Sequence, residues 1–136
     1  MDLSTALQIS AAGMKAQGTR LRVIAENLAN AQSIGEGPGD VPYRRQVVTF
    51  QDVFDREIGG TRVEVSGVAD DPSTFPRRYE PSHPAADAEG YVTYPNVNTL
   101  IEMMDMREAQ RSYEANLRVI ETARGMLTRT IDLLRA

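Results

Sequence analysis

The chain has 136 residues, a formal net charge of −4 at pH 7 and no cysteine, so a disulfide framework and a thiolate site are both excluded. Its three Phe, five Tyr and no Trp provide little bulk for a core, which argues against one compact globule although the length favours one domain. Nucleic acid is not an expected ligand, because phosphate binding requires clustered basic residues and none are present.

Residues 1–31 contain no proline, and their apolar side chains recur every three or four residues, which predicts a long helix. Asp2 or Ser4 can cap its first turn. Gly13 and Gly18 each cost about 1 kcal/mol in an isolated helix, but they allow another backbone to approach closely. The N-terminal series comprises Leu3, Leu7, Ser10, Met14, Gln17, Leu21, Ile24 and Leu28.

Residues 32–98 contain all seven prolines and most of the acidic excess, and they are expected to form a loop-rich β element. Residues 70–88 hold four of these prolines and can form little regular structure. Gly59-Gly60 can supply a turn between two strands. The predicted strands are residues 43–54, 61–68 and 91–94.

Residues 99–136 are again free of proline and predict a second long helix, which begins at Thr99 because Thr99-x-x-Glu102 has the form of a capping box. Its C-terminal series comprises Met103, Met106, Gln110, Tyr113, Leu117, Ile120, Arg124, Leu127, Ile131 and Leu134. We expect the two terminal helices to pair as an α-helical coiled coil. The predicted fold class is therefore mainly α with a small β element, in three segments: 1–31, 32–98 and 99–136.

No set of residues predicts an enzyme, a cofactor site or a metal site. His83 is the only histidine, and structural zinc sites normally draw on several Cys and His ligands. The carboxylate pairs Asp70-Asp71 and Asp52/Asp55 lack the apolar surroundings that would tune one member as an acid. No glycine-rich phosphate-binding loop occurs. The chain therefore offers no small-molecule substrate site.

The arginine doublets Arg44-Arg45 and Arg77-Arg78 are interpreted as solvated loop charges. Residues 100–136 balance six arginines against six acidic residues, so the second helix has no cationic face for lying on a membrane. No apolar run approaches the length of a membrane span, and the N-terminus has no basic region followed by an apolar run. We expect a chain that does not span the membrane and has no cleaved signal peptide.

Two blocks resemble the axial proteins of the bacterial flagellum, the family of rod, hook and hook-associated subunits. Residues 25–31 read AENLANA, which is similar to the N-L-A-N-[AT] signature of that family. Residues 90–98 read GYVTYPNVN, and with Glu102-Met103 and residues 111–116 they resemble the start of the C-terminal helix in proximal-rod members. The residues of the motif are Asn27, Leu28, Ala29, Asn30, Gly90, Tyr91, Pro95, Asn96, Val97 and Asn98.

The resemblance implies a structural subunit of the flagellar basal-body rod, exported through the flagellar type III apparatus and assembled helically across the periplasm to transmit torque for motility. The implied partners are further copies, other proximal and distal rod proteins, and the rod-base junction and membrane-ring components. Asn27, Asn30, Asn96 and Asn98 can satisfy free backbone groups where the helices end.

The expected assembly interface draws on both apolar series: Leu3, Leu7, Met14, Leu21, Ile24, Leu28, Met103, Met106, Tyr113, Leu117, Ile120, Leu127, Ile131 and Leu134. Two alternatives remain. One is a different rod or hook-base axial subunit, and the other is a cytoplasmic coiled-coil export adaptor that binds a client helix.

Overall fold

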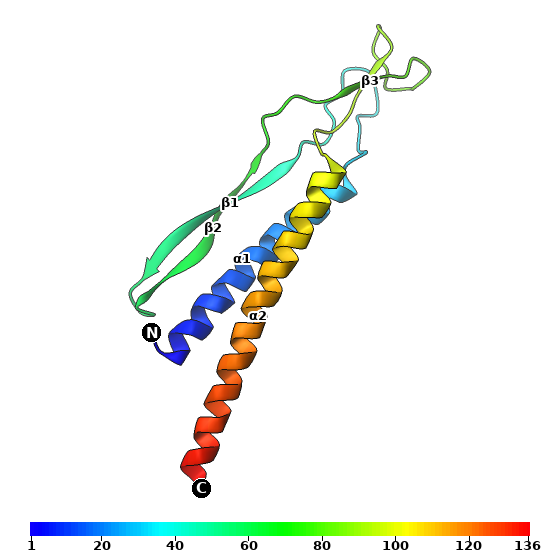
Figure 1. Ribbon diagram of the computed structural model, residues 1–136. Coiled ribbons are helices and arrows are strands. Elements are labelled where there is room, and N and C mark those ends of the chain that lie inside the picture. The colour runs from blue at the N-terminus through cyan, green and yellow to red at the C-terminus, as the bar shows by residue number, and fades with distance from the viewer. The chain divides into compact units, whose positions relative to one another are not determined.

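The computed structural model describes residues 1–136 and contains two long helices and two small sheets (Figure 1). The elements are α1 (Leu3–Ala29), β1 (Gln46–Asp55), β2 (Gly60–Asp70), β3 (Arg77–Tyr79), β4 (Tyr91–Thr93) and α2 (Thr99–Arg135). One sheet pairs β1 with β2, and the other pairs β3 with β4. The prediction of a mainly α chain with a small β part is confirmed.

The chain forms two compact units, each assembled from distant stretches of sequence. Unit 1 comprises Met1–Leu21, Val48–Gly67 and Arg107–Ala136, and unit 2 comprises Arg22–Val47 and Val68–Met106. Each unit therefore takes residues from all three segments of the sequence, because a strand pair or a helix face buries its apolar side only against another element.

In unit 1 the two helices run antiparallel. The place that a Cβ of Gly13 would occupy is 2.9 Å from Asn116 Nδ2, and Arg20 pairs with Glu108 at 3.4 Å. From Gly13 to Arg20 the contacts advance seven residues along α1, while the contacted residues on α2 move eight residues back, from Asn116 to Glu108, as antiparallel helices require. Gly13 is buried, so the close approach expected from the small residues of this helix is present.

The tip of the β1–β2 hairpin contacts the first turns of α1. Thr5 Oγ1 donates to the carbonyl of Ile58 at 3.1 Å, and a Cβ on Gly60 would lie 3.1 Å from Ile9 Cδ1. Gly59 has a φ of +68°, a conformation in which a side chain would be strained, so the predicted Gly59-Gly60 turn is confirmed.

Helix α2 is longer than α1, with 37 residues against 27. Since Gly13 faces Asn116 and the helices are antiparallel, the end of α2 continues beyond the first residue of α1, as Figure 1 shows. We call residues 127–135 the α2 tail. The tail has no helical partner within unit 1.

The buried face of α2 differs from the C-terminal series by one residue. Glu102, Ala109 and Ala123 are buried, whereas Met103, Gln110 and Arg124, one position later, are exposed. The face turned toward the rest of the chain therefore carries small and polar side chains, and the large apolar side chains lie beside it. Small residues allow a close helix approach, which a row of leucines would prevent.

In unit 2, β3 and β4 form an antiparallel pair with Arg78 opposite Val92. Strand β3 was not predicted, since residues 70–88 are rich in proline; it fits because it spans only three of the four residues between Pro76 and Pro81. Gly90 has a φ of +88°, and a Cβ there would lie 2.9 Å from the ring of Tyr79. Glycine is therefore required where the chain enters β4.

The predicted capping box at the start of α2 is wrong. Asn98 Oδ1 accepts hydrogen bonds from the amides of Leu100 and Ile101, at 3.1 and 3.3 Å, so Asn98 is the cap. The side chain of Glu102 is fully buried and binds other partners instead. At the other helix, Asp2 Oδ1 accepts from the amide of Thr5 at 2.7 Å, as one of the two predicted caps.

Candidate assembly site

A polar cluster in unit 2, with Asn27 and Glu102 buried and its other members partly buried, joins the end of α1, the start of β1 and the start of α2. We call it the polar junction and define it by Asn27, Tyr43, Arg45, Asp71, Asn96 and Glu102. These residues come from four separate stretches of the chain. Buried polar groups are stable only when their hydrogen bonds are made, so the partners of each side chain decide what the cluster does.

The side-chain amide of Asn27 makes the two hydrogen bonds to the backbone of Gln46 that a neighbouring strand would otherwise make. Its Nδ2 donates to the carbonyl of Gln46 at 2.8 Å, and its Oδ1 accepts from the amide of Gln46 at 3.0 Å. The hydroxyl of Tyr43 also donates to Oδ1, at 2.9 Å. The end of α1 is thereby attached to the first residue of β1.

Arg45 and Glu102 form the ionic centre of the junction. The Nε of Arg45 binds Glu102 Oε1, and its Nη1 binds Asp71 Oδ2 at 3.1 Å. Asp105 lies 3.6 Å from Nη2. Glu102 Oε2 accepts in addition from Asn27 Nδ2 at 3.3 Å. A carboxylate this deeply buried is tolerated because a cation and a second donor compensate its lost hydration.

Asn96 completes the junction by bonding to the backbone on two sides. Its Oδ1 accepts from the amide of Arg45 at 2.7 Å, and its Nδ2 donates to the carbonyls of Asp71 and Ser73, both at 3.2 Å. Asn96 thus occupies the amide of the residue just before β1, which starts at Gln46 and not at the predicted residue 43.

The environment of the junction shifts the pKa values of Asp71, Arg45 and Tyr43, each in the direction that keeps the group in its usual charge state at neutral pH. Hydrogen bonds from the backbone and side chain of Ser73, followed by that from Arg45, lower the pKa of Asp71. Burial opposes the charge of Arg45, but its contacts with Glu102 and Asp71 outweigh burial and raise its pKa. Burial raises the pKa of Tyr43, and nearby carboxylates add to this shift. All three groups therefore keep their present charge near neutral pH.

The interpretation of the arginine doublets as solvated loop charges is wrong for Arg44-Arg45, which are partly buried; Arg77-Arg78 are exposed, but they lie in β3 and contact aromatic rings. Arg45 belongs to the junction, and the guanidinium of Arg44 lies 4.2 Å from the centre of the Phe75 ring. Arg77 and Arg78 stack over the rings of Tyr91 and Tyr94, at 4.8 and 4.5 Å. The sequence signal was an arginine close to aromatic residues in the same loop-rich segment, a pairing that favours cation–π contact.

The remaining polar residues have structural partners of their own. His83 Nδ1 accepts from the amide of Ala85 at 3.0 Å, within a turn. A hydrogen bond from the backbone amide of Tyr91, followed by those from the backbone amide of Glu89 and the side chain of Arg77, lowers the pKa of Asp87. Asp55 pairs with Arg62 at 3.0 Å. No group of three or more His, Asp or Glu residues is arranged to hold a metal ion.

All residues of the sequence motif lie in unit 2. The buried members are Asn27, Gly90 and Pro95; the partly buried ones are Leu28, Asn30, Asn96 and Val97; the exposed ones are Ala29, Tyr91 and Asn98. Reasoning from sequence found both asparagines of the junction but missed its ion pair, because Arg45 and Glu102 are 57 residues apart.

The apolar residues expected to form the assembly interface have mixed burial. Ile24 is buried, whereas those partly buried are Leu3, Leu7, Met14, Leu21, Leu28, Met106, Tyr113 and Ile120. The exposed ones are Met103, Leu117, Leu127, Ile131 and Leu134. The exposed fraction reaches 84% at Leu134, so burial within the chain leaves the end of α2 uncovered. Neither long helix combines the length and apolar character that crossing a membrane requires.

Comparison with known proteins gives a consistent result. A family described as flagellar basal body rod FlgEFG protein C-terminal matches residues 88–133. The flagellar basal-body rod protein FlgC of Agrobacterium fabrum is 52% identical over 134 residues, which cover 98% of this chain and 96% of that protein. The FlgC proteins of Salmonella typhimurium and Bacillus subtilis are 40% and 36% identical, over 98% and 93% of this chain. The chain therefore belongs to the family of flagellar basal-body rod proteins FlgC.

Proposed function

We propose that this chain is a structural subunit of the proximal part of the flagellar rod, where copies and sister rod subunits pack helically and transmit torque. Its family membership supports the rod assignment. One structural observation carries the assembly mechanism: large apolar side chains of α2, among them Leu117, Leu127, Ile131 and Leu134, are exposed.

Several of these side chains lie on one face of α2. At 100° per residue, four exposed ones and the partly buried Ile120 lie within a face about 100° wide. We call this face the α2 stripe: Leu117, Ile120, Leu127, Ile131 and Leu134. Burying a fully exposed side chain of this kind contributes about 1.5–3 kcal/mol, and the stripe residues would each gain the part that corresponds to their exposed area. A stripe of this size favours a protein partner over permanent exposure.

The polar junction supports a mechanical role in a different way. It fixes the ends of both helices through side chains that bond directly to backbone groups, such as Asn27 to Gln46 and Asn96 to Arg45. A bend at this point would break several of these partly buried hydrogen bonds together, and their donors and acceptors would lose their partners. The junction therefore resists the deformation that a rotating shaft imposes.

The proposed partners are other rod proteins, rod-base junction and membrane-ring components, and the flagellar type III export apparatus. The proposed location is the rod where it crosses the periplasm. This assignment rests on the family and on the exposed apolar surface.

The test replaces one residue of the stripe. Ile131→Asp, expressed as the sole copy, should abolish swimming in soft agar and remove the chain from purified basal bodies, because a charge would be buried in the assembled contact. Leu133→Asp is the matched control: Leu133 is more exposed, 79% against 45%, and lies about 160° away on the same helix. Equal motility of the two strains would contradict the role of the stripe.

A cytoplasmic export adaptor is the remaining alternative from another class. It would need the apolar helices but not the polar junction. Relatives that match over nearly the whole chain are rod proteins, which favours the rod subunit. Fractionation separates the two: a rod subunit copurifies with detergent-extracted basal bodies, and an adaptor stays in the cytosol.

A further inference from the structure

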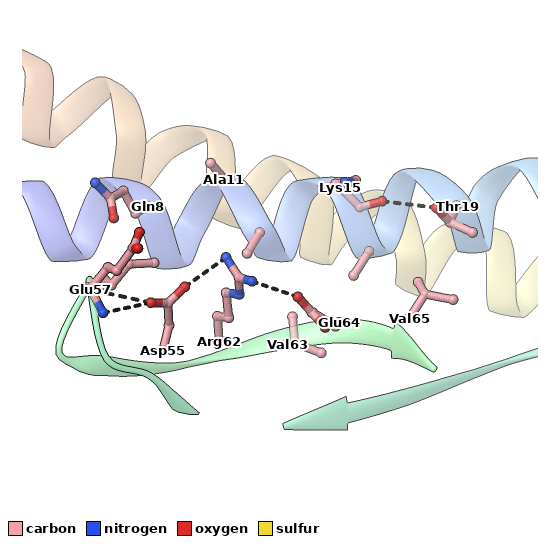
Figure 2. A pocket seen from close by; sticks show the side chains of 13 residues that line it. Gln8, Ala11, Lys15, Thr19, Asp55, Glu57, Arg62, Val63, Glu64 and Val65 are labelled. Atoms are coloured by element: carbon pink, nitrogen blue, oxygen red, sulfur yellow. Dashed lines mark hydrogen bonds and ion pairs between the residues drawn. The ribbon is translucent and has the colours of Figure 1, made fainter. Parts of the chain in front are cut away.

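Unit 1 contains an open groove between α1 and the β1–β2 hairpin. It encloses about 680 Å³, and Figure 2 shows α1 along one side and β2 along the other. Its apolar lining comes from Ala11, Ala12 and Ala16 of α1 and from Val63 and Val65 of β2. The volume falls within the range of clefts that admit ligands, roughly 300–1,000 Å³.

The hairpin contacts α1 at its tip. There Thr5 bonds to Ile58, and Gly60 lies against Ile9. Farther along α1 the groove is lined by the small side chains of Ala11, Ala12 and Ala16, with Lys15 and Thr19 beside them. A row of small residues opposite a strand therefore leaves a channel that lies along α1.

The edge of the groove is acidic at its hairpin side. Figure 2 shows Arg62 between Asp55 and Glu64, which it binds at 3.0 and 2.8 Å. Glu57, on the turn, lines the groove without an ion pair. With Lys15 opposite, the lining carries three carboxylates and two cations. An apolar segment with positive flanks therefore fits this site best.

The α2 tail has these properties. Leu127, Ile131 and Leu134 occur at the i, i+4 and i+7 spacing by which a helix inserts into an apolar groove. The charged residues on their face of the helix are Arg124 and Arg135. The tail cannot reach the groove of its own chain, because it continues α2 without a break past the first residue of α1, whereas the groove lies along residues 8–19.

We propose that the α2 tail of one copy inserts into the α1–hairpin groove of the next copy. This inference rests on the proposed function and names the contact by which copies associate. The tail and the groove are different surfaces, so the contact is heterologous: each copy uses its tail on one neighbour and its groove on another. Contacts of this type continue from copy to copy and generate helical arrays or rings.

The test uses the absence of cysteine in the natural chain. The double variant Ala12→Cys/Ile131→Cys, as the sole copy, places one thiol in the middle of the groove and one in the middle of the tail. Treating isolated basal bodies with a short bismaleimide should give covalent dimers, trimers and larger species of this chain on a denaturing gel. Either single variant can give dimers at most.

The matched control is Ala12→Cys/Leu133→Cys, because Leu133 lies on the opposite face of the same tail. The inference is overturned if the control gives the same products as the Ile131 variant, or if neither gives species larger than a dimer. If the Ile131 variant is missing from basal bodies, the same comparison on the concentrated purified full chain decides.

Two failures are distinguishable. A chain that is present in basal bodies but gives no cross-linked series keeps its role as a rod subunit and loses the proposed contact between tail and groove. Absence of the unmodified chain from basal bodies would instead contradict the proposed function itself.

Discussion

Different interactions stabilise the interior of each of the two units. In unit 2 the polar junction binds carboxylates, arginine and asparagine to one another and to the backbone. In unit 1 the helices meet through small residues, such as Gly13 against Asn116, and large apolar side chains remain exposed. The two buried side-chain atoms without a hydrogen-bond partner, Gln17 Oε1 and Arg62 Nε, both belong to unit 1.

The difference shows which interactions can be left for a partner to complete. A buried polar group without a partner costs about 1–3 kcal/mol at once, so a polar network must be satisfied within the chain. An exposed apolar side chain carries only the free energy that it would gain on burial. The polar network of unit 2 is thus satisfied within the chain, while apolar side chains of both units, such as Leu100 in unit 2 and Leu134 in unit 1, remain exposed and available for association.

The largest effect should come from breaking the polar junction. Glu102→Ala leaves Arg45 without its buried carboxylate and removes one of the two acceptors of Asn27 Nδ2, so we expect the free energy of unfolding to fall by about 3–5 kcal/mol. Urea unfolding followed by circular dichroism measures this loss. Glu108→Ala is the control, since Glu108 is largely exposed and its pair with Arg20 should contribute less than about 1 kcal/mol. Equal losses would refute the distinction.

The next effect tests packing in unit 1. Gly13→Val should destabilise the chain by about 1–3 kcal/mol, because the new side chain would overlap Asn116 where the helices approach. Gly18→Val is matched to it in residue type and helix, and nothing lies within 4 Å of the position of its Cβ. Thermal unfolding of both variants should therefore show a clear loss only at Gly13. A similar melting temperature for the two would contradict the close approach.

A smaller effect should appear on acidification. The pKa of Asp71 is lowered in the folded protein, so the stability from its contacts with Ser73 and Arg45 is complete above its unfolded pKa, near 4, and is lost as the pH falls further. We expect the unfolding free energy to decrease from about pH 5 toward pH 3, and Asp71→Asn to flatten part of this decrease. Asp52→Asn, at an exposed carboxylate, should leave the profile unchanged.

The smallest effect on the isolated chain is expected at the α2 stripe. Ile131→Asp should change the unfolding free energy of the monomer by about 0.5 kcal/mol or less, because the side chain touches solvent there. The same variant should lose assembly, which light scattering of concentrated protein and copurification with basal bodies both report. A large loss of monomer stability would mean that the stripe is already part of the folded core.

Local patterns in the sequence were sufficient for most of the secondary structure. The exclusion of proline from both ends predicted α1 and α2 to within two residues at each boundary, and Gly59-Gly60 marked the hairpin turn. These features depend on neighbours within a few residues, so they can be recognised without the fold. The short strand β3 escaped because its three residues have no pattern of their own and form a strand only beside β4.

The sequence by itself was therefore sufficient to predict the two helices and the hairpin, and to single out the asparagines of the motif. Tertiary structure alone decided that Arg45 and Glu102, 57 residues apart, form the centre of the polar junction, that Asn98 rather than Thr99 caps α2, and which face of α2 is buried. The reason is physical. The same helix could bury any of several adjacent faces. Which face is buried, and which residue pairs with a buried charge or packs against a small residue, is decided only when distant segments of the chain meet.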